Sequence, residues 1–221
     1  MFPPALRRGP GGAALALAGG LALALAFPDW RLPFLSAGAL VPLGLALEAL
    51  AATGAPRPLR RAFGRGWVFG LGLFGLGLFW IARLPLKEVT HPWVLYPALL
   101  VLMAYLSLFP GAAALAYVLL RRARVPAGAA LALAWLAGEQ LRAMGELGFP
   151  WLSLGYAWYQ HPAMLQWAAW GGLGAVSLWV AACDGLLFQA LLTPRPAGRA
   201  ALALAAPVLA TAVALSGTAA M

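Results

Sequence analysis

The sequence predicts an all-α protein, a polytopic bundle of about seven transmembrane helices in a single domain over residues 1–221. Two features of the composition support this fold class: 63% of the residues are hydrophobic and only 10% are charged. A third is that the apolar runs reach the roughly 18 to 20 residues needed to cross ~30 Å of hydrocarbon. A single soluble core cannot hold so much apolar surface. Helices are expected because each backbone polar group must be satisfied within the span, and the runs lack the alternation of a β-barrel.

The apolar runs define the expected spans in order: about 11–28, 32–53, 66–83, 94–120, 126–143, 164–192 and 199–217. The first run could instead be a signal peptide, because Arg7 and Arg8 precede it and it ends in Ala24-Leu25-Ala26. Its loss would leave the remaining topology unchanged. The third run is rich in glycine, which predicts close helix packing, with a groove for substrate as the alternative: Gly66, Gly70, Gly72, Gly75 and Gly77.

Basic residues predict the orientation, because cytoplasmic loops of membrane proteins are enriched in Lys and Arg. Eleven lie in alternate gaps: Arg7, Arg8, Arg57, Arg60, Arg61, Arg65, Arg121, Arg122, Arg124, Arg195 and Arg199. The other side has only Arg31, Arg83, Lys87 and Arg142. The amino terminus is therefore expected in the cytoplasm, and an odd number of spans places the carboxyl terminus outside, in the periplasm. The net charge of +9 then comes from loop residues that set the topology and lie beside anionic lipid. We expect no nucleic-acid partner.

Ionisable residues within the spans are candidates for function, because an unpaired charge in the bilayer is costly. Glu139 and Arg142 lie three residues apart near the outer end of their helix, on one face and within reach of a salt bridge. They are either a structural pair or a site for a polar headgroup or a charged residue of another domain. Glu48 and Asp184 lie toward the cytoplasmic ends of their spans, where water or arginines are within reach, and are expected to be structural.

The segment 144–163 is neither polar nor a clean span, and it combines helix-breaking Gly and Pro with several aromatic residues. It is expected to form an outer re-entrant or interfacial stretch covered by protein. Its rings suit the water–lipid boundary. An aromatic belt and a lipid-binding mouth open to the outer leaflet both explain this composition.

Catalytic and metal-binding groups are scarce. Cys183 is the only cysteine and lies deep in its span, so it is expected to be a core residue without a base or cation beside it. The two histidines each precede a proline, in His91-Pro92 and His161-Pro162, and are too few to hold a metal. We expect no metal site, no cofactor and no catalytic residue in this chain.

Several short motifs follow one another along the chain. They are Ala26-Phe27-Pro28, Gly66-Trp67-Val68-Phe69-Gly70-Leu71-Gly72 with Trp80, Ala104-Tyr105-Leu106-Ser107-Leu108, Glu139-Gln140-Leu141-Arg142, Gly148-Phe149-Pro150-Trp151-Leu152 and Gly155-Tyr156. With these motifs nearly the whole chain resembles the membrane portion of bacterial apolipoprotein N-acyltransferase.

The resemblance implies an enzyme of the bacterial inner membrane that transfers an acyl chain from a phospholipid to the amino group of a diacylated lipoprotein's first cysteine. In the family a nitrilase-like domain with a Glu-Lys-Cys triad follows the spans, and its cysteine carries the acyl group as a thioester. No triad residue has a counterpart here, so we expect a truncated and inactive form, ending about where that domain should begin.

By the same resemblance, five residues would shape the outer-leaflet entrance for the phospholipid acyl donor and the lipoprotein: Glu139, Arg142, Pro150, Trp151 and Tyr156. The main alternative is a non-catalytic lipid-binding membrane scaffold that docks a separately encoded nitrilase-like domain. A small transporter is a weaker option, because the polar residues form no evident path through several helices.

Overall fold

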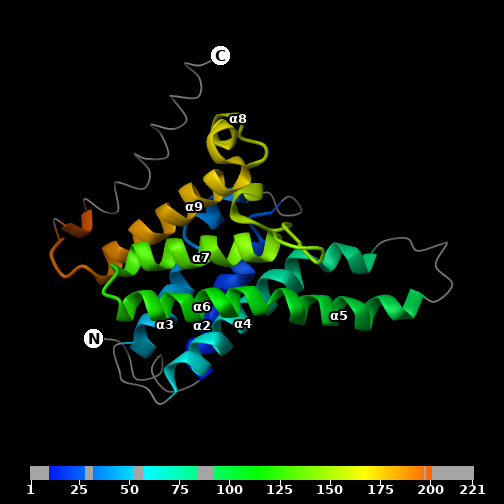
Figure 1. Ribbon diagram of the computed structural model, residues 1–221, viewed down its shortest axis with the longest axis horizontal. Helices are drawn as coiled ribbons and strands as arrows, with labels where there is room; N and C mark the ends of the chain where they lie inside the picture. Colours follow the sequence, from blue (N-terminus) through cyan, green and yellow to red (C-terminus); the bar gives the residue numbers. More distant parts are fainter. Residues whose placement is uncertain (1–9, 28–31, 52–56, 84–91, 197, 201–221) are drawn as a thin grey trace.

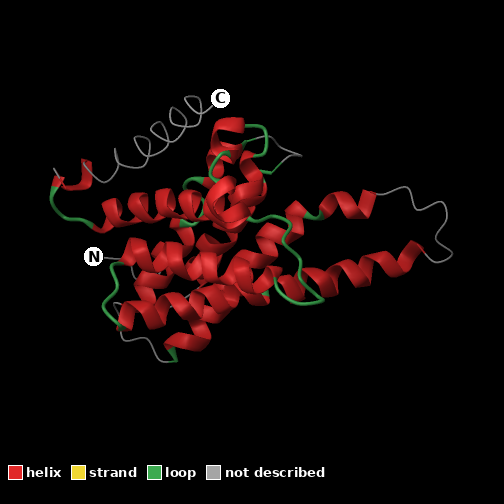
Figure 2. Cartoon of the chain, turned by 45° about the horizontal axis from the view of Figure 1, so that its top comes forward, coloured by secondary structure: helices red, strands yellow, loops and turns green. Residues whose placement is uncertain are grey.

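The computed structural model describes residues 10–27, 32–51, 57–83, 92–196 and 198–200. The described residues contain helices and no strand, which confirms the all-α class (Figure 2). The main helices are α2 (Pro10–Ala24), α3 (Val41–Ala51), α4 (Pro58–Gly77), α5 (Leu95–Leu106), α6 (Leu108–Arg122), α7 (Ala127–Ala143) and α9 (Ala168–Leu192). Short helical turns are η1 (Pro33–Ser36), η2 (Phe79–Arg83), η3 (Pro92–Val94), η4 (Leu154–Trp158) and α8 (Pro162–Leu165).

Four helical stretches of the described chain are long and apolar enough to cross a membrane: Pro33–Leu50, Pro58–Arg83, Leu95–Arg122 and Ala168–Leu192. Helix α2 is apolar but has 15 residues, and α7 has 17. The expected span 199–217 lies almost entirely outside the described residues. The structure thus supports four of the seven expected spans by length and composition, and the orientation stays a prediction.

The bundle is a continuous sequence of packed helix pairs, in which α2 contacts α4, α4 contacts α6, α6 contacts α7, and α7 contacts α9 (Figure 1). Helix α5 continues the line of α6 beyond this bundle, toward the end of α4 and η2 (Figure 1). Glycine allows the close contacts, since a Cβ on Gly66 would collide with the Pro110 carbonyl and one on Gly70 with Ser107. The predicted packing role is confirmed for Gly66, Gly70 and Gly72, whereas Gly75 faces open space and Gly77 lies against Leu152.

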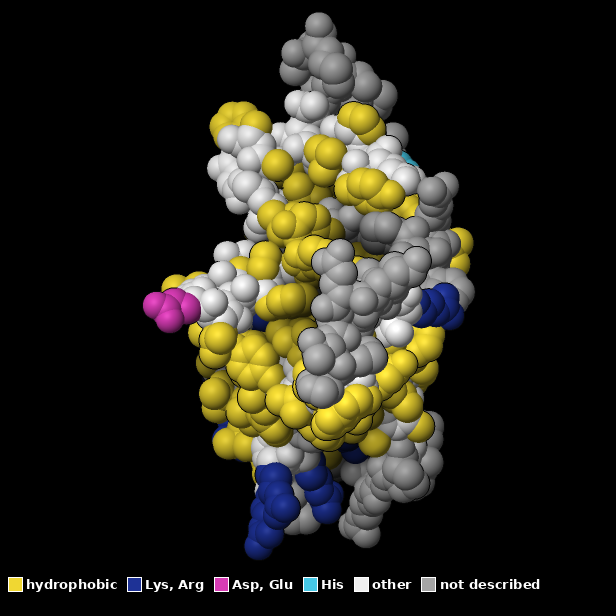
Figure 3. All heavy atoms as spheres, turned by 90° about the vertical axis from the view of Figure 1, so that its right-hand side faces the viewer, with side chains coloured by type: hydrophobic (Ala, Val, Ile, Leu, Met, Phe, Trp, Pro, Cys, Tyr) yellow, Lys and Arg dark blue, Asp and Glu magenta, His cyan; other side chains and the backbone are white. Residues whose placement is uncertain are grey.

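One end of the bundle carries the basic residues and an ion pair between elements. The Arg121 guanidinium donates to both oxygens of Glu48, at 3.0 and 2.8 Å, and the Tyr117 hydroxyl donates to the same carboxylate at 2.6 Å. Glu48 is therefore structural, as expected. Figure 3 shows several basic side chains at the end away from α8 and a further one at the edge, with mostly hydrophobic side chains over the middle of this face.

Asp184 differs from the expectation that it reaches water or an arginine. Its side chain is fully buried, and its Oδ1 accepts a hydrogen bond of 3.0 Å from the Leu40 amide, at the start of α3. The first amides of a helix lack partners within it, and Asp184 of α9 supplies one across the fold. Cys183 beside it is buried, as expected of a core residue.

The expected unbroken span 164–192 is interrupted near its amino-terminal end. Within α9 the backbone leaves helical geometry at Gly171 and Gly172, and Gly172 has φ +60° and ψ −155°. This conformation is essentially restricted to glycine. The Gly-Gly pair therefore separates residues 168–170, which follow α8, from the regular part of α9 that enters the bundle.

Candidate functional site

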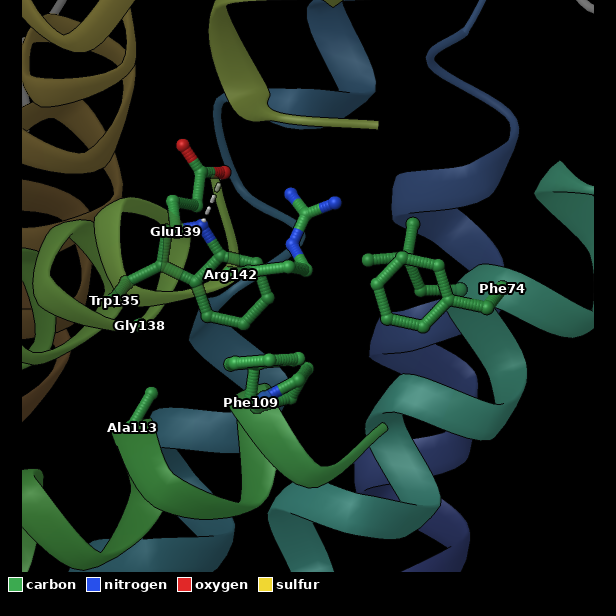
Figure 4. A pocket seen from close by; sticks show the side chains of 9 residues that line it. Phe74, Phe109, Ala113, Trp135, Gly138, Glu139 and Arg142 are labelled. Carbon is green, nitrogen blue, oxygen red and sulfur yellow. Dashed lines mark hydrogen bonds between the residues drawn. The ribbon is translucent and has the colours of Figure 1, made fainter. Parts of the chain in front are cut away.

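Arg142, in the last turn of α7, holds the segment that follows its own helix. Its Nη1 donates to the Phe149 carbonyl at 2.7 Å and also to the Trp151 carbonyl. Its Nη2 donates to the Ser153 hydroxyl at 3.0 Å. The guanidinium also lies over the Phe74 ring of α4, 5.3 Å from its centroid (Figure 4). Arg142 is only 3% exposed. A buried charge of this kind is tolerated because it is surrounded by acceptors.

Glu139, one turn earlier on α7, anchors the next part of the same segment. Its Oε1 accepts a hydrogen bond of 2.8 Å from the Trp135 indole, which Figure 4 shows. It accepts another of 2.8 Å from the Leu154 amide. Ser177 of α9 interacts with the same carboxylate. Glu139 and Arg142 attract each other electrostatically but do not form a direct ion pair among the described contacts. Their spacing on α7 leaves a salt bridge within reach, but each side chain turns instead toward the backbone of residues 149–154.

Two further hydrogen bonds fix the segment to other elements. The Gly155 amide donates to the Ser177 hydroxyl of α9 at 3.0 Å, and the Trp158 indole donates to the Ser36 hydroxyl of η1 at 3.0 Å. A Cβ on Gly155 would lie 3.1 Å from the Leu173 carbonyl oxygen and 3.1 Å from Val176 Cβ, so glycine favours this close approach to α9. Residues 149–158, which we call the outer segment, are thus held from three elements: η1, α7 and α9.

The backbone of the outer segment is strained at one residue. Leu152 has φ +60°, a left-handed conformation that is unusual for a residue with a side chain. Arg142 bonds to its neighbours on both sides, at the Trp151 carbonyl and the Ser153 hydroxyl. The surrounding contacts therefore impose this conformation, and they fix the direction of the Leu152 side chain.

Leu152 faces a cavity of about 540 Å³. The lining residues come from the end of α2, from α4 and η2, and from the outer segment: Phe27, Gly77, Trp80, Trp151, Leu152, Tyr156 and Tyr159. None of them is charged. The Trp80 and Trp151 rings stack at 5.4 Å between centroids with 21° between their planes, so η2 and the outer segment meet at this wall.

The cavity has an apolar inner end and a more polar rim. Phe27 and Leu152 are 4% and 8% exposed, and Gly77 beside them is buried. Trp151, Tyr156 and Tyr159 are 50%, 41% and 44% exposed, and they carry indole N–H and phenol O–H groups. This gradient suits an amphipathic ligand whose hydrocarbon lies inside and whose polar part remains at the rim.

The five residues singled out from the sequence lie in one region of the structure, but they have different positions relative to the cavity. Trp151 and Tyr156 line the cavity, whereas Pro150 shapes the turn before it, since its carbonyl accepts from the Ser153 hydroxyl at 2.6 Å. Glu139 and Arg142 lie behind the outer segment, beside a separate void of about 10 Å³ that has room for no more than about one water (Figure 4). They contact the outer segment's backbone and do not line the large cavity.

Sequence reasoning missed three residues of the inner end: Phe27, Gly77 and Leu152. Phe27 and Gly77 are apolar residues of apolar runs, where nothing in the pattern separates a cavity wall from ordinary packing. Leu152 lies in the segment that was singled out, but its left-handed backbone depends on tertiary hydrogen bonds. The described residues contain no group of three or more His, Cys, Asp or Glu that could hold a metal ion.

Fold and site together define a polytopic helical membrane protein with an aromatic-rimmed cavity, whose described lining residues are uncharged, beneath a fixed outer segment. Residues 19–186 match the family model described as the apolipoprotein N-acyltransferase N-terminal domain. The chain belongs to this family.

Curated relatives of that name agree with the match. The apolipoprotein N-acyltransferase of Caulobacter vibrioides is 41% identical over 165 residues, which cover 72% of this chain and 29% of the relative. The proteins of the same name from Geobacter metallireducens and Chromobacterium violaceum are 33% and 37% identical, over 79% and 76% of this chain. The chain spans about a third of the length of these relatives, 32% and 31% for the last two.

Proposed function

We propose that this chain forms the membrane part of an apolipoprotein N-acyltransferase and that its cavity receives an acyl chain of the phospholipid donor. The observation that carries the proposal is the uncharged cavity with a buried apolar end and a rim of Trp151, Tyr156 and Tyr159. A phospholipid chain matches this gradient, because its methylenes are stabilised in the apolar end while the ester carbonyls meet N–H and O–H donors at the rim.

In this proposal Trp151 and Tyr156 contact the lipid, and Glu139, Arg142 and Pro150 are positioning residues. Glu139 and Arg142 act through the outer segment, since their hydrogen bonds run to its backbone and to Ser153. The diacylated lipoprotein would approach the same rim. Loss of Glu139 or Arg142 would therefore move the rim without removing a side chain from the cavity lining.

The proposal extends to topology and chemistry. Residues 1–221 form one membrane domain of seven spans in the bacterial inner membrane, with the outer segment on the periplasmic side. The thiol of Cys183 is buried within α9 beside Asp184 and does not line the cavity, so it is not placed to carry an acyl group. Acyl transfer is therefore assigned to a nitrilase-like domain. Purified 221-residue chain mixed with phospholipid and a diacylated lipopeptide is expected to give no N-acylated product, and turnover would overturn this division of labour.

The entrance role is tested by Trp151→Ala and Glu139→Ala in a full-length counterpart that carries this membrane domain. We expect lipoprotein N-acylation, followed by mass spectrometry of the lipopeptide, to fall at least tenfold. Matched controls are Trp170→Ala and Glu146→Ala, because both side chains are exposed and neither lines the cavity. Unchanged acylation and protein abundance in the two test variants would contradict the role.

A further inference from the structure

The inner end of the cavity is closed by a contact between two elements. The Leu152 side chain lies against α4 at Gly77, where a Cβ would come within 2.6 Å of Leu152 Cδ1 and 3.2 Å of Cδ2. Both residues line the cavity. Because Gly77 has no side chain, the Leu152 methyl groups occupy the space against the helix, and the pair determines how deep the cavity reaches.

The Leu152 side chain has little freedom to leave this position by a backbone shift. Arg142 bonds to the Trp151 carbonyl before it and to the Ser153 hydroxyl after it, and Glu139 accepts from the Leu154 amide. The left-handed backbone of Leu152 is therefore fixed from both sides. Extra bulk at residue 77 would displace the flexible methyl groups into the cavity.

We infer that Gly77 and Leu152 form a depth stop that selects phospholipids by the length of the acyl chain. The inference rests on the proposed function, because it assumes that the cavity holds an acyl chain with its end toward Phe27, Gly77 and Leu152. Each methylene that no longer fits loses its van der Waals contacts with the cavity wall, which weakens binding of the longer chain. A Cβ at residue 77 shortens the cavity, and truncation at residue 152 lengthens it.

The variants Gly77→Ala and Leu152→Ala test the depth stop with opposite expected results. Purified full chain in detergent is incubated with dilauroyl and distearoyl phosphatidylethanolamine, and the dissociation constants are measured by native mass spectrometry. Gly77→Ala is expected to lower the preference for distearoyl over dilauroyl lipid about two- to fourfold. Leu152→Ala is expected to raise the same preference by a similar factor.

Gly75→Ala is the matched control, because Gly75 lies on the same helix and a Cβ there meets nothing within 4 Å. It should leave the preference unchanged. Bound lipid with an unaltered preference in Gly77→Ala and Leu152→Ala would overturn the depth stop while leaving the proposed function intact. Failure of the unsubstituted chain to bind either lipid would overturn the proposed function itself. If Gly77→Ala does not fold, the rise expected for Leu152→Ala still decides the inference.

Discussion

At the scale of single residues, Glu139 and Arg142 show how buried charges organise a segment of backbone. Their spacing on α7 suggested a pair bonded to each other, yet their hydrogen bonds reach residues 149, 151, 153 and 154. A segment rich in Gly and Pro cannot satisfy its own polar groups as a helix would. Buried side chains with a fixed place on a helix supply the missing partners.

Arg142→Met is expected to destabilise the protein by about 3 kcal/mol, because three buried or partly buried acceptors lose a charged donor and one face of Phe74 loses its cation. Thermal unfolding in detergent measures the change, and limited proteolysis within residues 149–158 reports whether the outer segment opens. Arg122→Met is the control, since Arg122 is exposed at the end of α6. Equal stability of the two variants would show that Arg142 does not hold the segment.

Glu139→Gln and Glu139→Ala separate the role of the charge from the role of the acceptor. Both described hydrogen bonds end on Oε1, which glutamine retains, so Glu139→Gln should cost less than about 1 kcal/mol. Glu139→Ala leaves the Trp135 indole and the Leu154 amide without an acceptor and should cost about 2 to 3 kcal/mol. The comparison uses the same unfolding measurement, and a larger loss in Glu139→Gln would mean that the negative charge itself is needed.

At the scale of elements, the position of the outer segment depends on how closely α7 and α9 cross. Gly128 and Gly185 face each other there, and a Cβ on either would collide with the carbonyl oxygen of the other. Small residues at such crossings allow backbones to approach within a membrane. The same crossing brings Ser177 of α9 near Glu139 of α7 and to the Gly155 amide.

Gly185→Val is expected to separate α7 from α9 and to destabilise the protein by about 2 to 3 kcal/mol, because backbone atoms cannot move aside as a side chain can. The melting temperature in detergent and the acylation activity of a full-length counterpart should fall together. Gly64→Val is the matched control, since a Cβ at Gly64 meets nothing within 4 Å. Comparable melting temperatures for the two variants would contradict a tight crossing at Gly185.

At the scale of the whole molecule, the basic end of the bundle and the outer segment should lie on opposite sides of the membrane. Arg122 and Arg124 lie at the end of α6, whereas the aromatic rim lies beyond the other end of α7. Lys and Arg remain on the cytoplasmic side during insertion, while Trp and Tyr are favourable at either interface. The charge distribution therefore decides which end faces the cytoplasm.

Cysteine labelling tests this orientation. In a Cys183→Ala background, Leu147→Cys should react with an impermeant maleimide in spheroplasts, because Leu147 is 75% exposed just before the outer segment. Arg122→Cys should react only after the membrane is permeabilised. Labelling in the reverse order would invert the proposed topology.

The sequence by itself determined the apolar character of the chain and the helical fold class, and its ordered motifs indicated the family. The first two follow from local composition, because bilayer thickness sets the length of an apolar run and backbone hydrogen bonding requires helices. The break at Gly171 and Gly172 within an expected span was not anticipated, since glycine is also common in unbroken transmembrane helices.

Only the tertiary structure decided what the site residues contact. Helical spacing places Glu139 and Arg142 on one face but does not say whether they bond to each other or to a neighbour. The left-handed backbone of Leu152 and its contact with Gly77 join residues 75 positions apart, so no local pattern could encode them. The cavity forms where the end of α2, α4 and the outer segment pack together, and its depth depends on how closely these elements pack.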